Sequence, residues 1–224
     1  KINFILRFLG EPGFGNGLGG HLQIDFIQKK IQLKIVYYGP ALSGKTTNLV
    51  CIHRFCSQET RGRLMTLETR DDRTLFFDLL PLQFESESGV SILVKLFTVP
   101  GQVIHNATRR LVLQGADSVA FIADSQTSMV QENQESFMNL KENLKDNGLN
   151  LKTMPLVIQF NKRDMPGVRS DAEIDAMAAK GREPVFKAIA TQGVGVLETF
   201  MGLMETTWER LNESHNLTGK FGIK

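Results

Sequence analysis

An eight-residue segment, Gly39 to Thr46 (GPALSGKT), matches the pattern G-x-x-x-x-G-K-[ST] in full. It follows the apolar run LKIVYY, which is typical of a buried strand, and it precedes a helix-compatible run. A loop of this kind at a helix N-terminus directs several backbone N–H groups toward one place and so cradles a polyphosphate. The segment therefore predicts a strand, loop and helix that together bind a nucleoside triphosphate.

The residue types within this loop predict separate contacts. Lys45 is expected to contact the β- and γ-phosphates, and the Thr46 hydroxyl is expected to bind Mg²⁺. The backbone of the loop and of the next residue is expected to surround the phosphates, which makes the candidate nucleotide-binding residues Gly39, Pro40, Ala41, Leu42, Ser43, Gly44, Lys45, Thr46 and Thr47. The motif alone indicates a nucleoside triphosphate and leaves the base open.

A second motif predicts which base is bound. The residues NKRD, at positions 161 to 164, follow the apolar strand LVIQF and match N-K-x-D. The Asp164 carboxylate can accept hydrogen bonds from the ring N–H and the exocyclic amine of guanine, whereas adenine would leave it unpaired. Ala190-Thr191, at the end of the next strand, is expected to close over the base. The candidate base-binding residues are Asn161, Lys162, Asp164, Ala190 and Thr191.

A third motif, TVPGQ at positions 98 to 102, follows the strand run SILVKLF. Gly101 has no side chain, so its N–H can approach the γ-phosphate closely. Gln102 can orient an attacking water because its amide both donates and accepts hydrogen bonds. The motif predicts a loop that senses the γ-phosphate.

The segments VYYGPALSGKTTNL, DDRTLFFDLLPL, TVPGQ and NKRD together resemble the MglA-like family, which comprises bacterial small Ras-like GTPases of cell polarity and motility. The similarity extends over roughly residues 24 to 212. The resemblance implies that Arg73 is a built-in arginine finger and that Thr74 is the switch threonine contacting Mg²⁺ and the γ-phosphate. The residues alone allow another interpretation, in which Arg73 pairs with Asp71 or Asp72 in a solvated loop.

The resemblance also implies a function and partners. It implies a switch that binds GTP or GDP with Mg²⁺, hydrolyses GTP slowly and signals through GTP-state effectors. The candidate catalytic residues are Gln102, Arg73 and Lys45, and the candidate metal ligands are Thr46 and Thr74. The implied activating partner is a roadblock-type dimer like MglB. The strand LFFDLLPL is expected to change register between states in this family, although it also suits an ordinary half-buried strand.

Two positions set limits on the expected activity. Thr98 stands where Ras-like proteins keep an aspartate, and a hydroxyl cannot replace the charge of a carboxylate. We therefore expect Mg²⁺ to rely more on Thr46, phosphate oxygens and water. Ala41 stands where the family resembles Ras in having glycine, and its methyl group is expected to slow hydrolysis by obstructing Gln102 or Arg73.

Short apolar runs alternate with helical stretches along the rest of the chain. Strands are predicted over 23–27, 32–38, 75–83, 91–99, 118–124, 156–160 and 185–190, and helices over 45–57, 106–114, 131–147, 171–180 and 196–212. The run SESG, 86–89, predicts one hairpin. The expected fold class is α/β, a three-layer P-loop NTPase of the Ras-like G domain type with a mostly parallel sheet and one antiparallel hairpin.

We divide the chain into an N-terminal extension with a glycine-rich linker (1–22), a G domain (23–212) and a C-terminal tail (213–224). The extension suits an extra edge strand, a loosely ordered tail or an amphipathic segment that touches a membrane or a partner. The net charge of +2 offers no strong field for nucleic acid, and no apolar run is long enough to span a bilayer. Cys51 and Cys56 fit reduced thiols of a cytoplasmic protein, which is expected at a cell pole in its GTP state.

Two other functions stay open from the sequence. Ala41 and Thr98 could have weakened turnover, which would leave a hydrolysis-impaired, GTP-bound scaffold module. An ATP-using kinase or ATPase is the other alternative, and the NKRD motif disfavours it.

Overall fold

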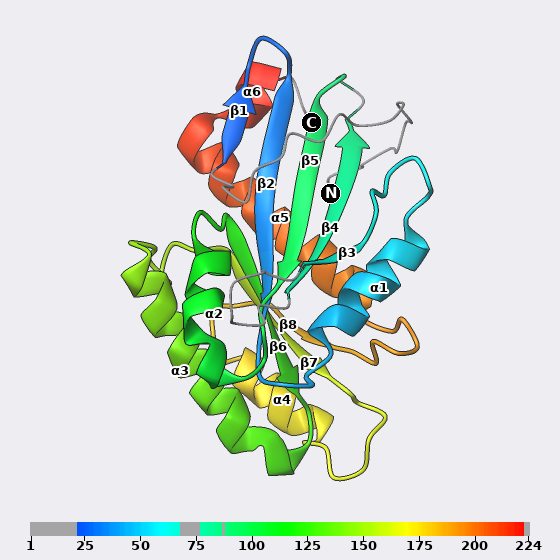
Figure 1. Ribbon diagram of the computed structural model, residues 1–224, viewed down its shortest axis with the longest axis vertical. Coiled ribbons are helices and arrows are strands. Elements are labelled where there is room, and N and C mark those ends of the chain that lie inside the picture. The colour runs from blue at the N-terminus through cyan, green and yellow to red at the C-terminus, as the bar shows by residue number, and fades with distance from the viewer. Residues whose placement is uncertain (1–21, 68–76, 87, 222–224) are drawn as a thin grey trace.

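The computed structural model describes residues 22–67, 77–86 and 88–221 of the chain (Figure 1). The core element is an 8-stranded sheet in the order β3-β4-β5-β2-β6-β7-β8, with β1 paired to β2 outside this path. The strands are β1 (Gln23–Asp25), β2 (Lys30–Tyr38), β3 (Met65–Leu67), β4 (Phe77–Glu85), β5 (Ser91–Thr98), β6 (Ser118–Asp124), β7 (Leu156–Asn161) and β8 (Val185–Lys187).

The pairing confirms a mostly parallel sheet. Strands β5, β2, β6, β7 and β8 pair in parallel, whereas β4 and β5 form the predicted antiparallel hairpin, which the Gly89 N–H closes by donating to the Ser86 carbonyl at 2.9 Å. Two further antiparallel pairs, β3–β4 and β1–β2, were not predicted. A strand at 23–27 was expected and is present as β1, whereas no strand was expected at β3, whose three residues are too few for a periodic pattern to show.

Helices cover both faces of the sheet, which makes the three layers expected for this fold class (Figure 1). The helices are α1 (Lys45–Phe55), α2 (Asn106–Leu113), α3 (Val130–Asp146), α4 (Asp171–Ala178), α5 (Val196–His215) and α6 (Leu217–Phe221), with 3-10 turns η1 (Val103–His105) and η2 (Thr127–Met129). One buried cluster joins the sheet to α1, α5 and α6, and the other joins it to α2, α3 and α4. Among the described residues, no helix is long and apolar enough to cross a membrane.

The last helix passes the end that we predicted at Asn212. It runs to His215, turns at Asn216 through a left-handed backbone (φ 52°), and is followed by α6. Leu217 and Phe221 are buried against the α1 and α5 side of the sheet. Of the N-terminal extension, residues 1–21 lie outside the described residues, so its three interpretations stay predictions.

The parallel arrangement gathers the predicted motifs at one edge. Strands β2, β5, β6 and β7 run in the same direction, so the loops that follow them emerge together. These loops contain the phosphate segment after β2, the TVPGQ segment at the end of β5 and the NKRD segment at the end of β7. Ligands of open α/β sheets bind at this carboxyl edge.

Candidate nucleotide-binding site

The phosphate loop wraps around its own lysine. Gly44, directly before α1, has a left-handed backbone (φ 96°), and a side chain there would collide with the amide nitrogen of Asn161. The Lys45 Nζ donates to the Pro40 carbonyl at 2.7 Å and to the Gly39 carbonyl at 3.2 Å. Burial is the main cause that lowers the pKa of Lys45 to about 7. The loop therefore holds a buried amine at its centre, where an incoming anion would stabilise the charged form.

Asn161 joins the phosphate loop to the base motif. Its side-chain amide donates to the Ser43 carbonyl at 2.9 Å, and its side-chain oxygen accepts from the Ala190 N–H at 3.0 Å. The side chain is 2% exposed, so both bonds are protected from water. The residues predicted for the phosphates and the residues predicted for the base are thus brought together.

The rest of the NKRD segment is held by the neighbouring strands. Lys162 forms an ion pair of 2.7 Å with the buried Asp124 at the end of β6. The backbone N–H of Arg163 donates to the Ala188 carbonyl at 3.1 Å. Asp164 follows on this anchored segment, and its side chain is exposed. An exposed carboxylate is accessible to a ligand. Its contact with guanine stays a prediction.

Asp78, a carboxylate that none of the sequence motifs indicated, lies beside the phosphate loop. Asp78 on β4 is 7% exposed, and its Oδ2 accepts from the hydroxyls of Thr46 at 2.6 Å and Thr98 at 2.9 Å. Its Oδ1 accepts from the Thr66 hydroxyl at 2.9 Å. A charged residue inside the apolar run LFFDLLPL is a signal that could have drawn attention to it.

The TVPGQ segment lies directly against the phosphate loop. A Cβ atom placed on Gly101 would sit 2.3 Å from the Cα of Ala41, so only glycine fits this approach. Gln102 is exposed, precedes η1 and has an extended backbone. Gly101 and Ala41 are therefore neighbours, whereas the obstruction of Gln102 or Arg73 by the Ala41 methyl group stays a prediction.

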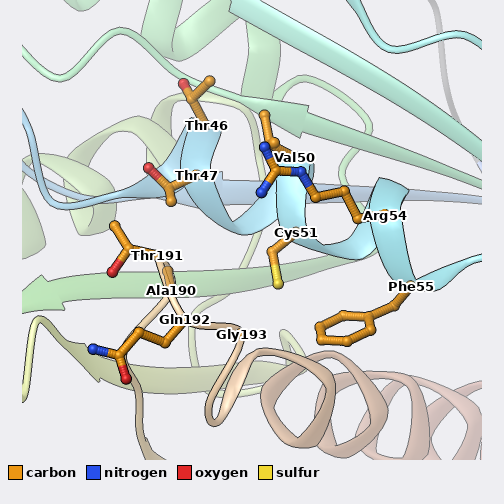
Figure 2. A pocket seen from close by; sticks show the side chains of 10 residues that line it. All are labelled: Thr46, Thr47, Val50, Cys51, Arg54, Phe55, Ala190, Thr191, Gln192 and Gly193. Atoms are coloured by element: carbon orange, nitrogen blue, oxygen red, sulfur yellow. The ribbon is translucent and has the colours of Figure 1, made fainter.

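Two cavities share Thr46 and Thr47. One, of about 340 Å³, lies between the phosphate loop and the ends of β4 and β5, and its lining includes Lys45, Asp78, Thr98 and Gly101. The other, of about 410 Å³, runs along α1 to the loop 190–193, as Figure 2 shows. Ala190 and Thr191 line this second cavity, so the expected base-closing residues face the same open space as the start of α1.

Two candidate residues, Arg73 and Thr74, lie outside the described residues. Their roles as arginine finger and switch threonine stay predictions. Within the described part of the chain, no group of three His, Cys, Asp or Glu side chains is placed to hold a metal.

A mostly parallel sheet whose carboxyl edge joins a G-x-x-x-x-G-K-T loop, an N-K-x-D loop and a TVPGQ loop defines a Ras-like P-loop G domain. No protein-family model matches the chain. Over 190 residues the chain is 43% identical to the Mutual gliding-motility protein MglA of Myxococcus xanthus (strain DK1622), and the match covers 85% of this chain and 97% of that relative. The chain belongs to the MglA family of small Ras-like GTPases, which confirms the resemblance read from its motifs.

Proposed function

We propose that this GTPase is a molecular switch that binds GTP and GDP with Mg²⁺, hydrolyses GTP slowly and presents different surfaces in its two states. The bond between the Asn161 amide and the Ser43 carbonyl supports this proposal most strongly, because it joins the two loops that one nucleotide would have to span. The candidate contacts are those predicted from the sequence, with Asp78 added.

The residues near Thr46 fit a magnesium ion. The Thr46 hydroxyl and the Asp78 carboxylate are hard oxygen donors 2.6 Å apart, and Mg²⁺ is usually held by one or two such groups together with substrate phosphates. When bound, Mg²⁺ neutralises charge on the phosphate oxygens. Asp78 supplies the negative charge that Thr98 lacks, so the departure at Thr98 does not leave this site without a carboxylate.

The chemistry that we propose is in-line attack of water on the γ-phosphate, which asks the protein to position groups and balance charge. Lys45 would face the β- and γ-phosphates. Gly101 would donate its N–H to the γ-phosphate, and Gln102 would hold the water. Arg73 would balance charge as the bond to the leaving group breaks. Loss of the γ-phosphate would release the loops of Gln102 and Thr74, which is the change of surface.

The relative's name concerns gliding motility, and we propose a related role here, in bacterial cell polarity or motility. The proposed regulator is an MglB-like roadblock dimer that accelerates hydrolysis, and the proposed readers are effectors of the GTP form. The proposed location is the cytoplasm, with enrichment at a pole in the GTP state.

The base assignment can be tested with Asp164→Asn. The substituted amide would lose the two acceptor contacts to guanine and could instead donate to the carbonyl that xanthine carries at the same place. We expect GTP affinity to fall by roughly 10²-fold or more and XTP affinity to rise. Asp146→Asn, on the exposed end of α3, is the control. Preference of the unchanged protein for ATP in competition would overturn the proposal.

A second candidate is a GTP-bound scaffold module with impaired hydrolysis. Gly101 approaches the backbone of Ala41, the residue whose methyl group we expect to slow hydrolysis, and this proximity favours it. Single-turnover hydrolysis with and without a roadblock partner separates the two functions. A rate that the partner raises supports the switch, whereas a bound GTP that persists under both conditions supports the scaffold.

A further inference from the structure

Helix α2, which begins four residues after Gln102, contains an arginine that is buried without a counter-charge. Arg109 is 0% exposed. None of the ion pairs among the described residues includes it. Its Nε and Nη1 also lack hydrogen-bond partners in that part of the chain. A hydrophobic side chain of similar size would stabilise such a site better, so the arginine points to a requirement other than stability.

Among the described residues, Arg109 contacts Tyr38 and Ser136, which lie in different layers of the fold. Its guanidinium carbon lies 4.3 Å from the centre of the Tyr38 ring, on the last residue of β2 before the phosphate loop. Its Nη2 donates to the Ser136 hydroxyl of α3 at 2.7 Å. The guanidinium therefore ties α2 to α3 and to the strand that leads into the phosphate loop.

An amide network, buried at Tyr38, Asn139 and Asn143 and reaching the exposed Asn106, fastens the first turn of α2 to the same two elements. The Tyr38 hydroxyl donates to Asn139 at 2.7 Å and accepts from Asn143 at 3.0 Å. Both asparagines donate to the side-chain oxygen of Asn106, the first residue of α2, at 2.9 and 2.7 Å. Tyr38 is thus shared by the network and by Arg109.

The two halves of α2 are held by different forces. Val112 and Leu113, at its C-terminal end, are buried in the hydrophobic cluster with α3. In the first half, nearest Gln102, the buried residues are Thr108 and Arg109. The half of α2 that follows the TVPGQ loop is therefore positioned by directional polar contacts and not by apolar packing. Helices α2 and α3 lie side by side (Figure 1).

We propose that Arg109 is a positioning residue for GTP hydrolysis, which fixes the first half of α2 and thereby holds Gly101 and Gln102 over the phosphate loop. The inference rests on the proposed function. It assigns Arg109 no contact with the nucleotide, because Asn161, Lys45 and the loop amides hold the ligand from other elements. Loss of Arg109 should accordingly affect hydrolysis and leave GDP binding nearly unchanged.

The experiment compares Arg109→Met, Arg109→Lys and Ser136→Ala with Arg110→Met. Arg110 is the next residue of the same helix, but its exposed side chain pairs with Asp146, so its loss should have no effect. A displacement of about 1 Å at a reacting group can lower a rate by roughly 10²-fold, and we expect a loss of that order in Arg109→Met. Arg109→Lys should recover part of the rate, because it keeps the charge without the planar fork.

Three measurements decide the outcome. They are the single-turnover hydrolysis rate, the GDP dissociation rate, and hydrogen exchange of the α2 backbone amides. The proposal expects slow hydrolysis, GDP dissociation within about twofold of the unchanged protein, and faster exchange confined to the first half of α2. Ser136→Ala removes one hydrogen bond of Arg109 and leaves its charge, so it should show the same three changes with smaller magnitude. It tests the proposal if Arg109→Met does not fold.

Two results would overturn the inference. One is unchanged hydrolysis in both Arg109→Met and Ser136→Ala. The other is an equal loss of hydrolysis and of GDP binding, which would mean that Arg109 only supports the fold. Failure of the unchanged protein to bind or hydrolyse GTP would instead contradict the proposed function, so the two failures are distinguishable.

Discussion

The Asp78 carboxylate accepts a 2.9 Å hydrogen bond from the hydroxyl of Thr98, on the neighbouring strand of the antiparallel hairpin. Thr98 ends β5 beside the phosphate loop, and the Asp78 carboxylate places a negative charge next to it. The register of β4 on β5, in which Leu79 pairs with Phe97, brings Asp78 next to Thr98. Any shift of that register would move the carboxylate away from Thr46.

Asp78→Asn should weaken the binding of magnesium, so that hydrolysis needs a higher Mg²⁺ concentration. The amide keeps the shape but removes the negative charge beside Thr46, so we expect the Mg²⁺ concentration for half-maximal hydrolysis to rise by about tenfold. A magnesium titration of single-turnover hydrolysis measures it, with Asp146→Asn as the control. An unchanged titration curve would remove Asp78 from the metal site.

Asn161→Ala should weaken nucleotide binding, because it removes the hydrogen bonds that join the phosphate loop to the NKRD segment and to Ala190. The substitution leaves the buried Ser43 carbonyl and the buried Ala190 N–H without partners, at about 1–3 kcal/mol each. GDP dissociation should therefore accelerate by roughly 10²-fold. Dissociation of a fluorescent GDP analogue measures the rate, and Asn150→Ala in an exposed turn is the matched control. Equal rates in the two variants would show that the loops do not depend on this side chain.

Ala41→Gly should raise the intrinsic rate of hydrolysis. The substitution removes the side chain from the residue whose backbone Gly101 approaches, and we expect it to ease the access of Gln102 to the attacking water. We expect a gain of about three- to tenfold, equal to roughly 1 kcal/mol of barrier, with little change in GDP affinity. Single-turnover assays on the pair of proteins test this, and a slower variant would mean that the methyl group helps to order the loop.

The lowered pKa of Lys45 predicts that the protein takes up a proton when it binds a nucleotide. Burial lowers its pKa to about 7 in the nucleotide-free protein, against 10.5 for an ordinary lysine. Between these values the unfolded chain binds more protons than the folded protein, so the stability of the nucleotide-free form should rise with pH in this window. A bound polyphosphate favours the charged lysine, so the pKa should rise and this pH dependence should disappear.

Calorimetry can detect that proton. At about pH 8.5, GDP binding measured in buffers of different ionisation enthalpy should show net uptake, because the lysine is mostly neutral before binding. A binding enthalpy that is independent of the buffer would contradict a neutral Lys45. Denaturant midpoints at several pH values, with and without GDP, give the matching stability measurement.

Truncation after Asn212 should destabilise the protein. It removes the end of α5 together with Leu217 and Phe221, which are buried against the sheet. Burial of two such side chains contributes about 3–6 kcal/mol, so the denaturant midpoint should fall clearly. Truncation after Phe221 is the control. A shortened protein as stable as the full chain would support our prediction that residues 213–224 are a tail outside the domain.

The predicted elements follow from local patterns, and most of their ranges agree with the structure. Strand β6 has the predicted bounds, 118–124, and all seven of its residues are buried, with five of them, VAFIA, making one continuous apolar run. Strand β8 ends at Lys187 and not at Ala190, because the chain there turns to bring Ala190 to Asn161. A local pattern carries no information about a contact with a residue far along the chain.

What the sequence determined by itself is the chemistry that each segment can perform. The spacing of glycines, lysine and threonine in 39–46, and of asparagine and aspartate in 161–164, states a local requirement for phosphates and guanine. The folding of the whole chain fixes which groups come into contact, such as Thr46 with Asp78 across 32 residues and Ser43 with Asn161 across 118. Strand pairing and register set these contacts, and both depend on the packing of the whole chain.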